Sequence, residues 1–229
     1  DVEVQEKQVL TGQETHTIIH DSDIPLGQLP RDVTPLAYQL SLKIIPELDL
    51  FNGTVAIDID IDSNRNHFYI HGENITTTRV QLISAGKTLD AKYEQVHKTG
   101  IVRISSPEPL NGLVKLEIEY NAPFNQALRG LYKVSESGRD YAFTQFEAIS
   151  ARLAFPGFDE PGFKTPFETT LIVPENEVAI SNTPEVSSEL VDGFRVVKFA
   201  PTKPLPTYLI AFAVGELDVV EWPDLPATD

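Results

Sequence analysis

The chain has 229 residues, 41% of them hydrophobic and 9% aromatic, which is enough to bury a sizeable core as one large all-β domain or two small ones. Its 34 acidic and 18 basic residues give a net charge of −16, and such a surface repels phosphate backbones and anionic membranes. We therefore expect no nucleic-acid partner. The absence of cysteine excludes a disulfide framework and thiolate catalysis.

Residues 1–28 are predicted to form an acidic N-terminal extension, because they carry six acidic residues and one lysine with weak periodicity. The chain starts at Asp1 and contains no methionine, which indicates a processed protein or a piece of a longer one. These features favour an exported, periplasmic protein, with a cytoplasmic one as the alternative. The longest apolar run, at 208–214, is far too short to cross a bilayer, so no transmembrane segment is expected.

Short stretches with a period of two follow one another along the rest of the chain, separated by turn residues. In TVAIDIDID (54–62) aliphatic residues alternate with acidic ones, which predicts an antiparallel strand with one wet face. The predicted strands are YQLSLKII (38–45), TVAIDIDID (54–62), HFYIHG (67–72), RVQLIS (79–84), IVRISS (101–106), LVKLEIEY (113–120), YAFTQFE (141–147), FETTLIVP (167–174), FRVVKFA (194–200) and TYLIAFAVGEL (207–217). We therefore predict an all-β fold, a saddle-like antiparallel double sheet or β-sandwich, with at most one short helix near Ala148–Leu153.

Three local patterns resemble metal sites, and each lacks a feature that the metal needs. HTIIH (16–20) and HFYIH (67–71) have two histidines four apart, as in a zinc-binding HExxH helix, but both lack the glutamate and lie in extended sequence. On a strand such histidines are about 13 Å apart, whereas zinc needs both nitrogens at about 2 Å. DIDIDSN (58–64) resembles the start of a calcium-binding EF-hand loop but has Ser63 where that loop needs glycine. No metal site is expected in this chain.

TQFEAISAR (144–152) places a glutamine and a glutamate among aromatic residues. Alternation along a strand would put Gln145 and Glu147 on one side and Phe146 on the other. Such a face is either a solvated strand surface or the wall of a pocket that holds a positive charge, and the residues alone leave both open. With no G-x-S-x-G elbow and no glycine-rich phosphate loop, no catalytic residue is expected within the chain.

The longer stretch TQFEAISARLAFPGFDEPGFKTPFETTLIVP (144–174) resembles the signature region in the N-terminal domain of zinc aminopeptidases of the aminopeptidase N group. That family carries T-Q-F/C-E-A, A-R, A-F-P-x-F-D-E-P and F-K in this order and spacing. Further similar stretches are LPRDVTPLAYQLSL (29–42), FNGTVAIDIDI (51–61), HFYIHGENI (67–75), GLYKV (130–134) and LPTYLIAFAVGEL (205–217). We therefore expect residues 29–217 to form this β domain and 218–229 to begin the connection to a catalytic domain.

The resemblance implies that the parent protein is a gluzincin metallopeptidase that removes N-terminal amino acids from peptides. In the family, the following catalytic domain bears G-A-M-E-N and HExxH with a later glutamate, and neither motif is present in this chain. Zinc and the general base are therefore expected from that missing domain, while this chain alone should bind no zinc and be inactive. A member that has lost its catalytic residues stays open.

The resemblance also implies roles for two residues. In this family the glutamate at the position of Glu147 helps to hold the substrate's free α-ammonium group, and the glutamine at the position of Gln145 lines the pocket for the first side chain. A carboxylate in a partly desolvated cleft would attract the ammonium group and fix where cleavage occurs. Neither residue is expected to act as the general base, and the expected partner is a peptide with a free N-terminus.

FPGFDEPGFK (155–164) is interpreted as scaffold rather than as a binding site. Pro156, Gly157, Pro161 and Gly162 predict a rigid turn. Asp159 and Glu160, with Arg152 or Lys164, are the expected ion-pair and capping partners that hold the strand of Glu147 in place. Gly157 departs from the cysteine that many relatives have at this position.

Two functions from different classes remain in view. The first is the substrate-anchoring domain of a zinc aminopeptidase, and the alternative is a non-catalytic β-sandwich module for binding or docking. The presence of both Gln145 and Glu147 favours the first, because a docking module would not require them.

Overall fold

The structure is a computed structural model that describes residues 24–220. Nine strands form a large sheet: β1 (Val33–Lys43), β2 (Leu50–His71), β3 (Thr76–Ser84), β4 (Lys87–Asp90), β5 (Lys92–Gln95), β6 (Ile101–Pro123), β9 (Phe167–Pro174), β11 (Glu185–Val191) and β12 (Phe194–Phe199). Four strands form a smaller sheet: β7 (Gly130–Glu136), β8 (Arg139–Gln145), β10 (Val178–Ser181) and β13 (Phe212–Gly215). The helical elements of the described residues are two single-turn 3-10 helices, η2 (Ala151–Leu153) and η3 (Thr207–Leu209).

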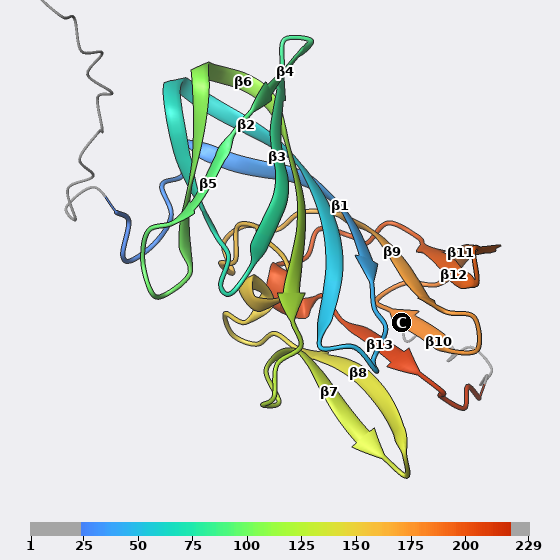
Figure 1. The fold of residues 1–229 in the computed structure, drawn as a ribbon. Helices are drawn as coiled ribbons and strands as arrows, with labels where there is room; N and C mark the ends of the chain where they lie inside the picture. Colours follow the sequence, from blue (N-terminus) through green and yellow to red (C-terminus); the bar gives the residue numbers. More distant parts are fainter. Residues whose placement is uncertain (1–23, 221–229) are drawn as a thin grey trace, which may run out of the picture.

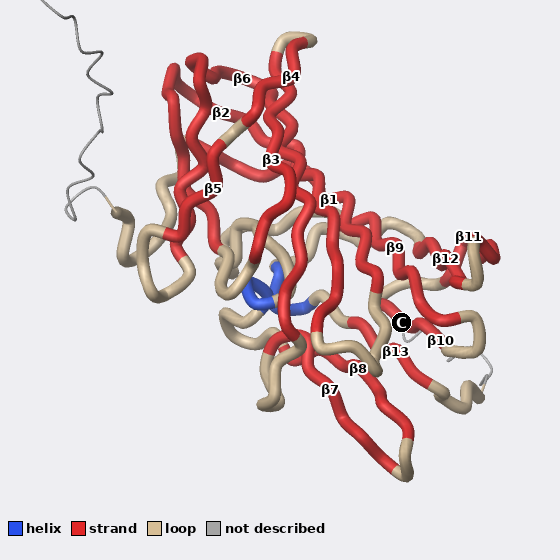
Figure 2. The backbone as a smooth tube through the Cα atoms, viewed as in Figure 1, coloured by secondary structure: helices blue, strands red, loops and turns tan. Residues whose placement is uncertain are grey.

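The large sheet curves through the upper part of the molecule in Figure 1, and the small sheet lies below it. The strand order is β11-β12-β9-β1-β2-β6-β3-β4 in the large sheet, where β5 also pairs with β6, and β10-β13-β8-β7 in the small one. The described strand pairs are antiparallel except for β1 with β9. The predicted all-β double sheet is confirmed, and Figure 2 shows the few helical residues gathered near the middle of the molecule.

β2 and β6 join stretches that the sequence predicted as separate strands. β2 includes 54–62 and 67–71, all but the last residue of the predicted strand 67–72, and β6 includes both 101–106 and 113–120. The β2–β6 register shifts between Ile61 and His67, so bulges absorb the polar residues that had indicated a turn. The predicted period of two in 54–62 is confirmed, because one face of this part of β2 is buried and the opposite face is more exposed. Val55, Ile57, Ile59 and Ile61 are buried, Asp58 and Asp60 are half-buried, and Asp62 is exposed.

The last predicted strand, 207–217, is correct only in its second half. Its first residues form η3, which follows Pro206, and the backbone N–H of Ile210 donates to the carbonyl oxygen of Thr207. Proline has no N–H to give to a sheet, and here it precedes a tight 3-10 turn instead of extending β13.

Both ends of the chain lie outside the described range. Residues 1–23, with the HTIIH pair and most of the predicted acidic extension, are not among the described residues, and neither are 221–229. Between these limits, no helix is long and apolar enough to cross a membrane.

A row of aromatic rings connects the two sheets. Tyr38 of β1 stacks on Phe167 of β9, with ring centroids 4.4 Å apart. Phe155 lies edge-on to Phe167 at 6.1 Å and Phe146 lies edge-on to Phe155 at 5.9 Å. Phe146 also lies edge-on to Phe212 of β13, at 6.1 Å. Because aromatic pairs favour such geometries, this row ties the segment after β8 to both layers of the domain.

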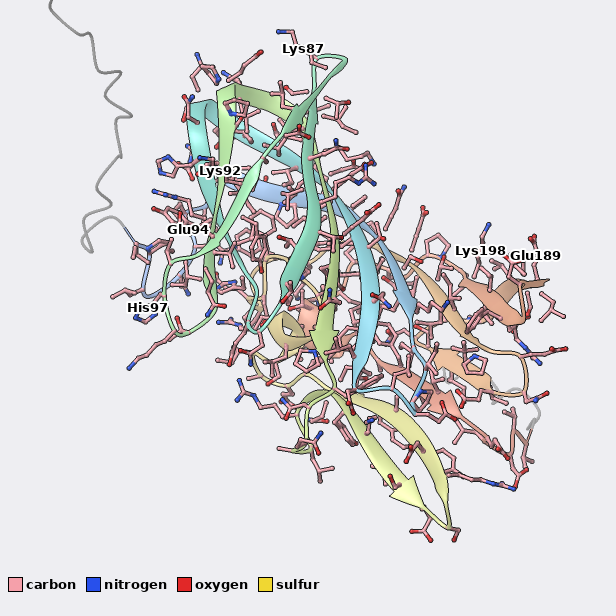
Figure 3. All side chains as sticks on the ribbon, in the orientation of Figure 1. Lys87, Lys92, Glu94, His97, Glu189 and Lys198 are labelled. Carbon is pink, nitrogen blue, oxygen red and sulfur yellow. The ribbon has the colours of Figure 1, made fainter. Side chains whose placement is uncertain are left out.

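The charged surface lies away from this core. In Figure 3, the labelled side chains project outward, with Lys87 on β4 and Glu189 on β11 at the two ends of the large sheet.

Candidate functional site

Gln145 and Glu147 lie at the point where the β7–β8 hairpin meets the aromatic row. Gln145 is the last residue of β8, so the strand ends before Glu147, unlike the continuous alternation that the sequence predicted. The backbone N–H of Ser150 donates to the carbonyl oxygen of Phe146 at 2.8 Å, closing a turn over residues 146–150 that we call the Glu147 turn. Gln145 and Glu147 are both exposed, and Phe146 between them is 2% exposed.

The carboxylate of Glu147 has no cationic neighbour among the residues that the structure describes. Within residues 24–220, no Lys, Arg or His nitrogen lies within 4 Å of it. The peptide bond after it is cis. An exposed carboxylate without an internal counterion is available to bind a cation from outside.

The segment after the turn is buried and fully bonded. The Arg152 Nε donates to Asp159 Oδ2 at 2.9 Å, and its two terminal nitrogens donate to the backbone carbonyl oxygens of Thr99 and Asp159 at 2.7 and 3.1 Å. The hydroxyl of Thr207 donates to Asp159 Oδ1 at 2.6 Å. A buried charge pair is stable only when its remaining donors and acceptors are also satisfied, and here they are. We call Arg152, Asp159, Thr207 and His71 the buried framework.

His71 completes this framework from the end of β2. Its backbone exchanges two hydrogen bonds with Gly157, at 2.7 and 2.9 Å, and its Nδ1 accepts the backbone N–H of Asp159 at 3.3 Å. Burial and then the Arg152 charge lower the pKa of His71 to about 3. The ring is therefore neutral at ordinary pH, which is the state in which Nδ1 accepts a hydrogen bond. The sequence showed His71 only as a strand residue in a failed metal motif.

The expected scaffold pairs are found in part. The Arg152–Asp159 pair is present, but Glu160 binds elsewhere: its Oε1 accepts the backbone N–H of Leu29 at 2.6 Å and its Oε2 lies 3.4 Å from Arg31. Lys164 is exposed and forms no ion pair with any described residue, so the alternative pairing with Lys164 is wrong. The sequence missed Arg31 because its partner lies far along the chain.

A cavity of about 470 Å³ opens next to the framework. Its lining includes Ile149 of the Glu147 turn, His71, Arg152 and Asp159. The turn therefore borders a recess of ligand size through Ile149, whereas Gln145 and Glu147 are not among the residues that line it.

The sequence patterns that resembled metal sites are strand residues in the structure. HFYIH (67–71) and DIDIDSN (58–64) both lie on β2 in an extended conformation. Across the described part of the chain there is no group of three or more His, Asp or Glu side chains able to hold a metal ion.

Comparison with known proteins agrees with this architecture. The family model for the peptidase M1 N-terminal domain matches residues 34–209. The chain belongs to the peptidase M1 N-terminal domain family. The matched range includes β1 to η3 and with them the Glu147 turn and the whole buried framework.

Several curated relatives of this M1 domain are named as aminopeptidases. It is 32% identical to puromycin-sensitive aminopeptidase of Caenorhabditis elegans, over 86% of this chain and 22% of that protein. It is 30% identical to glutamyl aminopeptidase of Mus musculus, over 85% and 22% of the two chains, and 29% identical to aminopeptidase M1-D of Oryza sativa subsp. japonica, over 85% and 23%. The chain thus spans less than a quarter of the length of these relatives.

Proposed function

We propose that this M1 domain anchors the substrate of an aminopeptidase that removes N-terminal amino acids from peptides. Glu147 binds the α-ammonium group, and Gln145 lines the pocket for the first side chain. The observation that carries the proposal is the exposed Glu147 carboxylate, which has no counterion within the described residues while the neighbouring charges are paired. Membership of a peptidase family and relatives named as aminopeptidases support it.

The physical logic concerns how an exopeptidase recognises a chain end. An ammonium group next to a carboxylate in a partly desolvated cleft forms a charge-assisted hydrogen bond, and an internal residue of a peptide has no such group to offer. Holding that group at a fixed place positions the first peptide bond for cleavage. The aromatic row and the buried framework keep the Glu147 turn in place, which such positioning requires.

The catalytic zinc and the general base are proposed to come from a following catalytic domain. In this proposal the residues of this chain bind and orient the substrate, and the metal ligands belong to the following domain. When bound in that domain, zinc supplies an activated water for peptide hydrolysis.

The direct test replaces Glu147 by Ala in the full-length protein. We expect kcat/KM on peptides with a free N-terminus to fall about 10- to 100-fold, with a raised KM, because one partner of a desolvated charge pair is lost. Zinc content should stay the same. Glu189→Ala is the matched control, since Glu189 is an exposed acid on edge strand β11.

Three outcomes would contradict the proposal. Equal kcat/KM in the Glu147→Ala variant and the wild type would exclude the anchoring role. Chelator-sensitive peptide hydrolysis by residues 1–229 alone would show that the catalytic groups lie in this chain. A full-length protein without hydrolytic activity would instead support a docking module.

A further inference from the structure

Arg129 lies where the β7–β8 hairpin begins, beside the end of β8. The next residue, Gly130, pairs with Gln145 across the two strands. Gly130 has a φ of 68°, and a Cβ there would lie 2.9 Å from the Cβ of Leu153 in η2. Only glycine allows both this backbone conformation and this approach to η2. The pairing therefore brings Arg129 to the segment that carries Glu147.

The guanidinium group of Arg129 links two other elements. Its Nε donates to the hydroxyl oxygen of Ser150 at 3.1 Å, and Nη2 lies 3.5 Å from Oε2 of Glu73. Ser150 is 4% exposed, whereas the Arg129 side chain is 50% exposed. Arg129 thus connects the closing residue of the Glu147 turn to the loop after β2.

Glu73 is in turn attached to the buried framework, because its backbone N–H donates to the carbonyl oxygen of Arg152 at 2.8 Å. One end of the Glu147 turn is therefore held by Phe146 in the aromatic row. At the other end, Ser150 contacts Arg129, and Arg129 pairs with Glu73, which is bonded to the buried framework. Both ends of the turn are therefore attached to the core of the domain. Glu147 projects between two fixed ends.

The charge of Arg129 matters as well as its contacts. A cation this close to the turn would compete with an ammonium group if it paired with Glu147. Among the described residues, however, Arg129 pairs with Glu73 and is not within 4 Å of the Glu147 carboxylate. Glu73 therefore neutralises Arg129 and leaves Glu147 free.

We propose that Arg129 is a positioning residue for Glu147: it clamps the Glu147 turn through Ser150, and Glu73 keeps its charge away from the substrate-binding carboxylate. The inference rests on the proposed function and deepens it. An ion pair as exposed as Arg129–Glu73 contributes little to folding stability. The effect of the clamp is therefore expected in substrate binding.

The test measures steady-state kinetics of the full-length enzyme on a peptide with a free N-terminus. We expect Arg129→Ala to raise KM about fivefold while kcat stays within about twofold, because a looser turn weakens the ammonium contact. Ser150→Ala should act in the same direction, and Arg129→Lys, which keeps a donor and the charge, should restore part of the affinity. Arg139→Ala is the matched control: Arg139 lies at the other end of the same hairpin, is exposed and pairs with Glu216 at 3.0 Å.

A double-mutant cycle separates positioning from general damage. In the Glu147→Ala background, Arg129→Ala should leave KM unchanged, since the group that it positions is gone. The same KM increase in both backgrounds, or a loss of kcat with a lowered melting temperature, would overturn the proposal. If Glu147→Ala alone leaves KM unchanged, the proposed function fails; if it raises KM and Arg129→Ala does not, only the clamp fails.

Discussion

The Glu147 turn and the Arg152–Asp159 pair of the buried framework lie within a few residues of each other in the chain, yet their charged groups have opposite environments. In the framework, Asp159 accepts from Arg152 on one oxygen and from Thr207 on the other, out of contact with water. In the turn, Glu147 is exposed and has no counterion among the described residues.

The difference shows how one segment can combine rigidity with an available charge. Hydrogen bonds to buried charged groups are strong and directional, so they fix the backbone around them. A binding carboxylate must not be satisfied internally, or it would have to give up that partner to bind a ligand. In this domain the bonded charges, Arg152 and Asp159, follow the exposed carboxylate of Glu147 closely in the chain. The following variants change buried groups that are bonded, closely packed or without a partner.

The largest effect is expected from Asp159→Ala. It leaves the Arg152 guanidinium, 7% exposed, without its carboxylate, and an uncompensated buried charge costs about 3–5 kcal/mol. Urea denaturation of the 229-residue chain measures the loss. The matched control is Asp58→Ala, which removes the partly exposed pair with Lys115 and should cost less than about 1 kcal/mol. Similar losses in the two variants would mean that the framework is not what stabilises this region.

Gly157→Ala examines how tightly the framework is packed. A Cβ at Gly157 would lie 2.9 Å from the hydroxyl oxygen of Tyr38, which accepts the backbone N–H of Phe158 at 2.8 Å. We expect a loss of about 1–3 kcal/mol in the free energy of unfolding, because a well-packed site must shift to admit the methyl group. Gly27→Ala is the control, since nothing lies within 4 Å of a Cβ there. An unchanged stability for Gly157→Ala would show that the site has room.

Glu177 provides a third case, an acid that is buried but lacks a partner. It is 5% exposed, and its Oε2 has no hydrogen-bond partner in the structure. Burial, with smaller contributions from Glu47 and Glu216, raises its pKa to about 7. The folded state therefore holds this proton more tightly than the unfolded state, so the carboxyl destabilises the fold above pH 7 and has no such effect below about pH 4.5.

Glu177→Gln should consequently raise the free energy of unfolding by about 1–3 kcal/mol at pH 8 and leave it nearly unchanged at pH 4.5. Urea denaturation at the two pH values measures this difference. Glu175→Gln, at an exposed neighbouring position, is the matched control and should show no pH-dependent gain. A gain at pH 4.5 as large as that at pH 8 would assign the effect to packing instead of charge.

The amino-acid pattern alone was enough to predict the class of fold, most strand positions and the residues on which the candidate site is built. A period of two is a local property, so it predicted the buried face of residues 54–62 in β2 and the strand at β9. Gln145 and Glu147 were singled out by their residue types, and their proposed roles came from the resemblance of 144–174 to a family signature. Local signals misled where bulges absorbed polar residues within β2, where β8 ended at Gln145 and where Pro206 led into η3, and they did not predict the short strands β4, β5, β10 and β11.

Only the tertiary structure decided which residues hold the site. The partners of Asp159 include Thr207 and His71, and those of Arg129 are Ser150 and Glu73, and the tertiary fold brings these residues together from separate parts of the chain. No local sequence pattern predicts such a partner. A hydrogen bond depends on which residues lie close together in space, and these residues are not neighbours in the sequence. For the same reason, the sequence showed that Glu147 is charged, but only the fold showed that no residue of 24–220 forms an ion pair with it.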